Sequence, residues 1–332
     1  MKLLVTGGTG FIGSHLAENA LRANHDVSIL GLANLPEEKS NINMLEGLGA
    51  KIYPGSVTDH DLCDQAMNGV THIYHLAVAM REGGESDEYF EQINLAGTER
   101  ILKAATAKRV KRFVYCSTIG IFGHRFDGIA NEDHPLSPGN VYEKTKVAAE
   151  KLVLRHSCEK VLQVVILRPA DVYGPRDHRL LKLFKAINRG RFPLFGDGSG
   201  RRHMVYVDDV VSAFRMACES NDAIGKTMII AGPEVCTLIE LITVIQRAAH
   251  QNRYGFQLPL KPMLIIAGVV EDIFKKLRLD PPIYRRRMDF FHSDSAFDIS
   301  RAEAVIGWTP NIGLKEGIRR TLAAYSEANL FD

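Results

Sequence analysis

The fold of this chain is set by its first fifteen residues, Met1-Lys-Leu-Leu-Val-Thr-Gly-Gly-Thr-Gly-Phe-Ile-Gly-Ser-His15. The apolar run 2–6 predicts a buried strand, and the amphipathic pattern after the glycines predicts a helix. Gly7 allows a sharp turn, Gly10 allows the backbone to approach a diphosphate, and Gly13 allows the helix to lie near the strand. The free N–H groups and the positive end of the helix dipole would then face a bound anion.

The surroundings of this turn decide between two interpretations. Glycines also cluster in ordinary structural turns, so their spacing alone is a weak signal. Here a strand precedes the glycines and a helix follows them, which favours a dinucleotide-binding turn over a purely structural one.

Apolar runs and amphipathic stretches alternate through the first half of the chain. Further strands are expected at 26–30, 50–53, 72–77, 112–116 and 162–168. Helices are expected at 36–48, 59–67, 89–107 and 141–157. This alternation predicts an α/β fold, a doubly wound parallel sheet of the Rossmann type with helices on both faces.

The alternation breaks after Pro175, where glycine, proline and arginine become frequent. Short apolar runs at 204–207 and 227–230 predict strands that return to the sheet. Thr237-Leu-Ile-Glu240 predicts a capping box that opens a helix to about residue 249.

These elements divide into two expected domains. A dinucleotide-binding Rossmann domain would span 1–174, with 204–232 returning to it. Residues 175–203 and 233–332 would form a smaller, mixed α/β substrate domain over the carboxyl ends of the strands, where ligands bind in such sheets.

The composition is that of a globular protein with a small-molecule substrate. The 332 residues are 45% hydrophobic and 24% charged, with a net charge of +2, so nothing indicates a nucleic-acid partner. The basic clusters 108–112 and 285–287 are expected to be solvated faces or loops.

The cysteines and the hydropathy indicate a cytoplasmic protein. Five scattered cysteines without C-x-x-C spacing favour reduced thiols over a disulfide frame or a metal site. The first strand begins at the N-terminus, which leaves no room for a signal peptide. The apolar run 258–270 is interrupted by two prolines and a lysine, and no integral membrane span is expected. A loop and short helix in the core or substrate pocket are favoured there, and interfacial attachment stays open.

Tyr142 and Lys146 form the second informative pattern, because residues four apart share one face of a helix. A nearby ammonium group stabilises a phenolate and lowers a tyrosine pKa from its free value of about 10. Tyr142 is therefore a candidate acid or base for a substrate hydroxyl. Thr118 follows the strand at 112–116 and could hold the substrate oxygen. A surface helix and a turn hydroxyl are the plain structural alternatives.

These stretches resemble the extended short-chain dehydrogenase/reductases, in the group of NAD-dependent epimerase/dehydratases and 3β-hydroxysteroid dehydrogenases. The resemblance runs nearly end to end. It is carried by Thr6–Gly13, His75-Leu-Ala77, Asn94-Leu-Ala-Gly-Thr98, Ser117-Thr118 with Gly123, Tyr142 with Lys146, Leu167-Arg-Pro-Ala-Asp-Val-Tyr-Gly-Pro175, Gly196-Asp-Gly198 with Arg202, Val207-Asp-Asp209, Asp298-Ile-Ser-Arg-Ala302 and Ile306-Gly-Trp308 with Pro310.

The resemblance implies hydride transfer at a secondary alcohol or ketone. Tyr142 would move the hydroxyl proton, Lys146 would bind the nicotinamide ribose and tune Tyr142, and Thr118 would orient the oxygen. The implied cofactor contacts are Gly7, Gly10, Phe11, Ile12, Gly13, Gly31, Ser56, Val57, Leu76, Ala77, Asn94, Ser117, Tyr142, Lys146, Pro169 and Val172. The implied substrate contacts are Thr118, Tyr142, Asp171, Arg202 and Arg286. The resemblance also implies a homodimer that pairs through the helices expected at 89–107 and 141–157.

The second strand departs from the usual cofactor signature. An acid that binds the adenosine ribose, or a base that binds a 2′-phosphate, normally ends this strand. Gly31-Leu-Ala-Asn34 supplies neither, so NAD is preferred and NADP stays open, with Lys39 as a cation that could fold back. Ser56 stands where an acid is typical of the family's adenine-contacting segment.

The substrate signals point in two directions. Ile119-Gly120 replaces the Asp-Glu pair that sugar-nucleotide dehydratases carry after the catalytic threonine, which disfavours dehydration. Asp171 replaces an asparagine common in sugar-nucleotide epimerases and would repel a diphosphate unless paired. Arg202 and the cluster 285–287, in contrast, match positions of diphosphate-binding arginines. The apolar stretch 258–274, with Pro281-Pro282 after it, resembles the hydroxysteroid dehydrogenase branch, although it could also be core.

Three functions follow from these patterns. The leading one is an NAD(P)-dependent oxidoreductase acting on a hydroxyl or keto group of a largely apolar or mixed substrate, with a sterol-like molecule as an example. The second is a nucleotide-sugar epimerase that keeps NAD bound without net turnover. The third is a non-catalytic dinucleotide-binding regulator, which the intact set of Thr118, Tyr142 and Lys146 disfavours.

Overall fold

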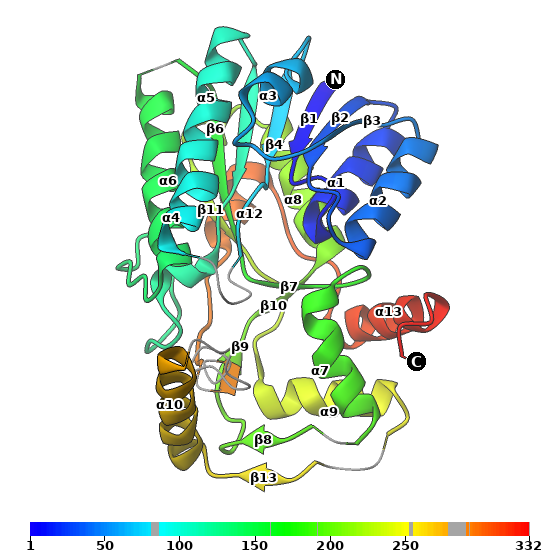
Figure 1. Ribbon diagram of the computed structural model, residues 1–332, viewed down its shortest axis with the longest axis vertical. Coiled ribbons are helices and arrows are strands. Elements are labelled where there is room, and N and C mark those ends of the chain that lie inside the picture. Colours follow the sequence, from blue (N-terminus) through cyan, green and yellow to red (C-terminus); the bar gives the residue numbers. More distant parts are fainter. Residues whose placement is uncertain are drawn as a thin grey trace.

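The computed structural model describes residues 1–80, 86–159, 161–190, 192–251, 255–277, 290–291 and 293–331. Seven parallel strands form the central sheet in the order β11-β6-β5-β4-β1-β2-β3 (Figure 1). They are β1 (Lys2–Thr6), β2 (Asp26–Gly31), β3 (Lys51–Pro54), β4 (His72–His75), β5 (Arg112–Cys116), β6 (Val164–Pro169) and β11 (Thr227–Ile230). The predicted doubly wound parallel sheet is confirmed.

Helices cover both faces of the sheet because neighbouring strand residues point to opposite sides. On one face Leu3 and Val5 pack with α1 (Phe11–Arg22), α2 (Pro36–Gly47), α8 (Val207–Glu219) and α12 (Ser300–Ile306). On the other face Leu4 and Ile73 pack with α3 (His60–Ala66), α5 (Thr98–Ala107) and α6 (Val141–Cys158). Each face therefore has its own fully buried apolar core.

The helix expected at 89–107 has three consecutive parts. It begins as α4 (Asp87–Phe90), widens into the π-helix η1 (Glu91–Gly97) and continues as α5. Single π-helical turns are frequent at functional sites, because the wider turn displaces a side chain from the regular helical register. Asn94 lies in this turn.

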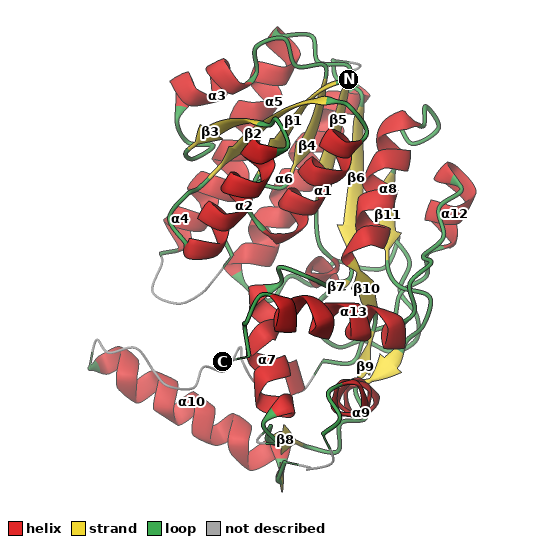
Figure 2. Cartoon of the chain, turned by 90° about the vertical axis from the view of Figure 1, so that its right-hand side faces the viewer, coloured by secondary structure: helices red, strands yellow, loops and turns green. Residues whose placement is uncertain are grey.

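Apart from α8, β11 and α12, the second half of the chain lies beyond the carboxyl ends of the strands (Figures 1 and 2). Its elements are β7 (Asp171–Tyr173), α7 (His178–Asn188), β8 (Leu194–Phe195), β9 (Arg201–Arg202), β10 (Met204–Tyr206), β12 (Cys236–Thr237), α9 (Leu238–Ala248), β13 (Gln257–Leu258), α10 (Leu260–Lys276) and α13 (Leu314–Glu327). The expected capping box is present, since the Thr237 hydroxyl accepts from the Glu240 N–H and the Glu240 carboxylate accepts from the Thr237 N–H.

Two expectations for this half are wrong in detail. The run at 227–230 joins the central sheet as β11, but the run at 204–207 does not: β10 pairs in parallel with β7 in a separate two-stranded sheet. The short helix expected within 258–270 is the longer helix α10, which begins at Leu260 directly after β13, and Pro262 lies in its first turn, where proline is tolerated. Ile265, Val269 and Ile273 on α10 are exposed, so this face is not core.

The family-like motifs late in the chain fasten it to the sheet. The Asp209 carboxylate on α8 accepts hydrogen bonds from the N–H groups of Asn311 and Ile312. The indole of Trp308, fully buried, donates to the Asp209 carbonyl and the Ser212 hydroxyl. These residues hold the C-terminal segment in place and do not line a site.

No helix among the described residues is long and apolar enough to cross a membrane.

Candidate active site

The glycine-rich turn leaves β1 where the strand order reverses, between β1 and β4. Gly7 has a φ of +69°, and a Cβ there would lie 2.8 Å from the backbone N of Ala77. A Cβ on Gly13 would lie 2.2 Å from the Gly7 carbonyl oxygen. Both positions therefore require glycine, for turning and for close packing of α1. A Cβ on Gly10 would lie 3.3 Å from the Gly7 carbonyl oxygen, a tight contact that would require the backbone at Gly7 to shift by a few tenths of an ångström.

The N-terminus of α1 is open to an anion. Gly10 is the N-cap in extended conformation, with no side-chain hydrogen bond to the helix and no acidic residue in the first turn. The first N–H groups, at Phe11 and Ile12, lack intrahelical partners, as at the start of every α-helix. Uncapped N–H groups and the helix dipole are the elements that bind a diphosphate at such a turn. The expected dinucleotide fits this geometry.

Gly31 ends β2 beside the same turn, at a position where Thr9 leaves no space for a side chain. A Cβ on Gly31 would lie 2.5 Å from Oγ1 and 2.9 Å from Cγ2 of Thr9. Thr9 is 2% exposed, and its carbonyl accepts a hydrogen bond from the Asn41 amide at 2.8 Å. Thr9 thus occupies the space that an acid at position 31 needs, which explains the departure noted in the sequence.

The remaining expected cofactor contacts follow the ends of other strands. Leu76 and Ala77 lie directly after β4, against Gly7, and Pro169 ends β6. Ser56 and Val57 lie after β3, where the Ser56 hydroxyl accepts from the Thr58 N–H and hydroxyl. All these carboxyl ends share one edge of the sheet, because the strands are parallel.

Lys146 connects α6 to the end of β5. Its Nζ donates to the Cys116 carbonyl at 2.6 Å and lies 4.2 Å from the centre of the Tyr115 ring. Burial lowers the pKa of Lys146 to about 8. Tyr142 lies one turn earlier on the same helix and is half-buried. The structure therefore brings the Tyr–Lys pair to the carboxyl end of β5, beside Ser117.

Ser117 and Thr118 have different surroundings. The Thr118 hydroxyl accepts from the Gly120 N–H at 3.1 Å and caps the 3₁₀ turn η2 (Ile119–Phe122). This is the structural role weighed against a substrate contact for Thr118. The Ser117 hydroxyl is buried and has no hydrogen-bond partner among the described residues. An unpartnered buried hydroxyl has bonding capacity to spare for a ligand.

Asn94 ties the loop after β4 to the helix that carries Tyr142. Its amide oxygen accepts from the Ala79 N–H at 2.7 Å, and its amide nitrogen donates to the Ala79 carbonyl and to the Thr145 hydroxyl at 3.0 Å. In this structure Asn94 positions neighbouring segments.

Asp171 lies near enough to Arg202 for its charge to act on the guanidinium, because β7 runs in parallel with β10, the strand that follows β9 and Arg202. Asp171 pairs with Met204, and its N–H donates to the His203 carbonyl. Arg202 is 5% exposed, yet Nε and Nη2 have no hydrogen-bond partner among the described residues. Its guanidinium lies 4.7 Å from the centre of the Phe290 ring. Burial lowers the pKa of Arg202, and the Asp171 charge opposes that change.

An aromatic cluster beside Arg202 was not found from the sequence. Phe291 stacks on Phe192 at 5.8 Å and meets Phe195 edge-on at 4.8 Å, next to Phe290. The adjacent pair Phe290-Phe291 was the only visible signal, and nothing in the sequence tells which segments it packs against. Arg286, an expected substrate contact, lies outside the described residues.

The fold defines a Rossmann-type α/β enzyme class. The model of the NAD dependent epimerase/dehydratase family matches residues 3–231, about two thirds of the chain. The chain therefore belongs to this family, whose members act as dehydrogenases, reductases, epimerases or dehydratases. The family resemblance and the enzyme class expected from the sequence are confirmed, and so is NAD as the cofactor at the level of the family.

Individual relatives divide between two substrate classes. The chain is 28% identical over 336 residues to the 2-alkyl-3-oxoalkanoate reductase of Stenotrophomonas maltophilia, covering 98% of this chain and 99% of that one. It is 28% identical to the decarboxylating sterol-4-alpha-carboxylate 3-dehydrogenase of Candida albicans, with 96% of each covered. The UDP-glucuronic acid 4-epimerase of Bacillus cereus, solved with NAD, has the same fold, with a TM-score of 0.82, 24% identity and all of both chains covered.

Proposed function

We propose that this chain is an NAD(P)-dependent oxidoreductase that transfers a hydride at a secondary hydroxyl or keto group of a largely apolar molecule bearing a carboxylate. The observation that carries the proposal is the buried Arg202 guanidinium over the ring of Phe290, which belongs to a cluster of four phenylalanines. A buried charge without a partner is costly, so such a group is expected to meet an anion when substrate binds.

The chemistry around Arg202 favours a carboxylate on an apolar body. Phe192, Phe195, Phe290 and Phe291 offer an apolar surface, and one unpaired guanidinium balances one carboxylate. A diphosphate carries more negative charge, and Asp171 nearby would repel it. Two relatives support this choice, because each is named for a substrate with a carboxylate on the carbon next to the reacting one.

The catalytic roles are assigned to residues at the end of β5 and the start of α6. In the oxidation direction, the Tyr142 oxygen accepts the proton of the substrate hydroxyl. Lys146, cationic below its pKa of about 8, stabilises the negative oxygen of Tyr142 and binds the nicotinamide ribose. Ser117 and Thr118 orient the substrate oxygen. NAD bound over the glycine-rich turn would supply the redox chemistry, as acceptor of the hydride from the carbon that bears the hydroxyl.

The proposed preference for NAD over NADP is modest. Neither an acid nor a base ends β2, and Thr9 fills the space beside Gly31. NADP stays open because no carboxylate here would repel a 2′-phosphate.

The test compares matched substrates. We expect purified protein to reduce NAD when given 3-hydroxydodecanoate, and to turn over 2-dodecanol, which lacks the carboxylate, much more slowly. Stoichiometric NADH production, followed at 340 nm, would contradict the second candidate, a nucleotide-sugar epimerase. Interconversion of UDP-sugars without net NADH, with no activity on the acid, would overturn the oxidoreductase proposal.

A homodimer through the α4–η1–α5 helix and α6 is part of this proposal. These helices pack side by side on one face of the sheet (Figure 1), so two copies could form a four-helix interface. A monomeric mass in light scattering would contradict it.

A further inference from the structure

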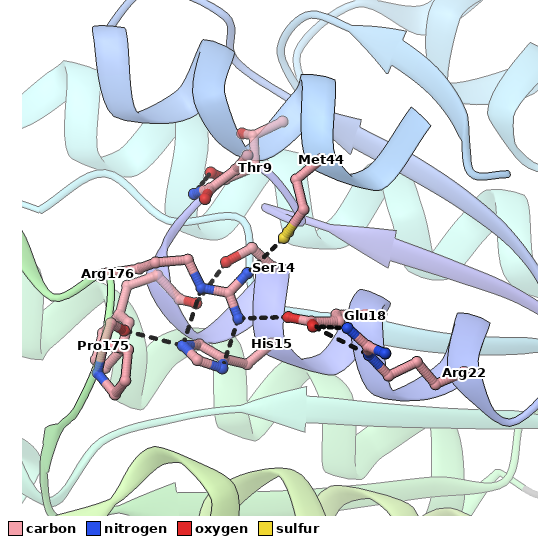
Figure 3. A network of polar contacts seen from close by, with 10 residues as sticks. Thr9, Ser14, His15, Glu18, Arg22, Met44, Pro175 and Arg176 are labelled. Carbon is pink, nitrogen blue, oxygen red and sulfur yellow. Dashed lines mark hydrogen bonds and ion pairs between the residues drawn. The ribbon is translucent and has the colours of Figure 1, made fainter. Parts of the chain in front are cut away.

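Two arginines three residues apart, Arg176 and Arg179, differ sharply in how they are bonded. The guanidinium of Arg176 bonds Glu18 Oε2 at 2.8 Å, His15 Nδ1 at 2.6 Å and the sulfur of Met44 at 3.4 Å (Figure 3). His15 also meets the Pro175 carbonyl at 2.9 Å. Arg176 therefore fastens the segment after β7 to α1 and α2.

Arg179, in the first turn of α7, is held at one edge and free at the other. Its Nε and Nη2 donate to the Asp177 carboxylate at 3.1 and 3.3 Å, and Nη2 donates to the Val172 carbonyl at 2.9 Å. Asp177 is fully buried, whereas the Arg179 side chain is 47% exposed. No hydrogen bond to Nη1 is formed within the described part of the chain. The planar fork is thus fixed in position, with one nitrogen still available.

The Arg179 guanidinium lies among residues that the sequence had assigned to cofactor and substrate. The Arg179 guanidinium is 5.9 Å from the centre of the Phe11 ring in the glycine-rich turn, and it bonds the backbone of Val172. Burial opposes its charge, but Asp177, with smaller contributions from Asp171 and Tyr142, raises the pKa of Arg179. Arg179 is therefore a permanent cation between the glycine-rich turn and the candidate catalytic tyrosine.

We propose that Arg179 is an anion-binding residue of this cleft, and that its Nη1 donates to an anionic oxygen, either of the dinucleotide diphosphate or of the substrate carboxylate. The buried Asp177 carboxylate already holds the side chain, so little rotamer entropy is lost when the anion binds. Asp171 is the one carboxylate whose charge acts on both Arg179 and Arg202, where it favours the cationic form of each guanidinium.

The inference rests on the dinucleotide-binding part of the proposed function, and its test begins with Arg179→Gln. Calorimetry measures the Kd for NADH and for ADP-ribose, which keeps the diphosphate but lacks nicotinamide, and then for dodecanoate added to NADH-saturated protein. Loss of a charge-assisted hydrogen bond should weaken the relevant ligand by roughly 10- to 100-fold. Lys182→Gln, which removes an exposed cation one turn further along α7, is the matched control.

The ligands separate the two sources of the anion. Weaker NADH and ADP-ribose binding assigns the contact to the diphosphate, and weaker dodecanoate binding alone assigns it to the carboxylate. If wild-type protein binds no dodecanoate, the diphosphate measurements decide. Unchanged affinities in Arg179→Gln, with NADH binding intact in the wild type, overturn this inference alone. Failure of the wild type to bind any dinucleotide overturns the proposed function.

A second variant controls for misfolding of Arg179→Gln. Arg179→Gln leaves the buried Asp177 carboxylate without its main partner, which can destabilise the protein. Asp177→Asn/Arg179→Gln removes both charges, so it should keep a cooperative thermal transition and show the same loss of affinity. Wild-type affinity in this double variant also contradicts the proposal.

Discussion

The glycine-rich turn and the Arg202 cluster are both proposed to bind anions, but they are built differently. At the turn, the binding groups are backbone N–H groups of consecutive residues, and glycines at 7 and 13 make room for the fold itself. At Arg202, the charge comes from β9 and the aromatic surface from Phe192, Phe195 and the remote pair Phe290-Phe291. The first site depends on the backbone of one segment, whereas the second depends on the side chains of several segments.

The largest expected effect lies outside both sites, at Tyr142 on α6. Tyr142→Phe removes the group that moves the proton, so turnover should fall by about 10²–10⁴-fold, the usual contribution of general acid–base catalysis. NADH affinity by calorimetry and the thermal transition should stay near wild type. Near-wild-type turnover in this variant means that the proton moves elsewhere.

The next largest effect is expected at Arg202, where one substitution should weaken substrate binding but stabilise the ligand-free protein. Arg202→Met should raise KM for 3-hydroxydodecanoate by roughly 10- to 100-fold, as expected for a lost charge-assisted hydrogen bond, and leave 2-dodecanol unchanged. Because the guanidinium is buried and unpartnered, the same change should raise the melting temperature of the ligand-free protein.

Arg201→Met is the matched control for this prediction. Arg201 is paired with Asp294 at 2.6 Å and bonds the carbonyls of Phe126 and Gly128. Its loss should lower the melting temperature. If the two variants shift the melting temperature in the same direction, the buried and unpartnered Arg202 guanidinium does not destabilise the ligand-free protein.

A third, smaller effect tests why β2 ends in glycine. Gly31→Asp alone forces a Cβ against Thr9 and should cost about 1–3 kcal/mol in stability, the usual cost of overpacking. Thr9→Gly/Gly31→Asp should recover part of that stability and favour NADH over NADPH more strongly than wild type. Urea unfolding and the two Kd values measure this. If Gly31→Asp sharpens cofactor preference without any loss of stability, Thr9 does not restrict the site.

These contrasts explain how much the sequence could predict. The sheet, its helices and the position of the turn follow from apolar periodicity and glycine spacing, which are local properties. The strand that pairs with β10 could not be predicted in this way. An apolar run such as 204–207 predicts a strand, but it does not indicate which other strand it will pair with. Pro262 was taken as an interruption, although a proline in a first turn is compatible with the whole of α10.

In the candidate site, too, features that depend on local sequence spacing could be predicted, and features that depend on distant segments could not. Tyr142 and Lys146 could be found because their spacing is itself the signal. Arg202 could be named by resemblance, but its lack of a partner depends on what β7, β10 and Phe290 place around it. Arg179 gave no signal at all, because its position is decided by the buried Asp177.

The smallest effect concerns Lys146 and pH. Its pKa falls from 10.5 to about 8 on folding, because burial penalises the charged form. Between these values the unfolded chain binds more protons than the folded chain, so stability rises with pH through this window. For the ligand-free protein, the Lys146 contribution to the free energy of unfolding should be about 1 kcal/mol larger at pH 9 than at pH 7.

The measurement is urea unfolding at both pH values for wild type and Lys146→Met, with the exposed Lys144→Met as control. The change in unfolding free energy between the two pH values is measured for each protein. The change for Lys146→Met is subtracted from that for wild type, which removes the contribution of the other titrating groups. A difference of zero, or one of opposite sign, means that the cofactor-free protein holds Lys146 in a more solvated position than its 2.6 Å contact with the Cys116 carbonyl indicates.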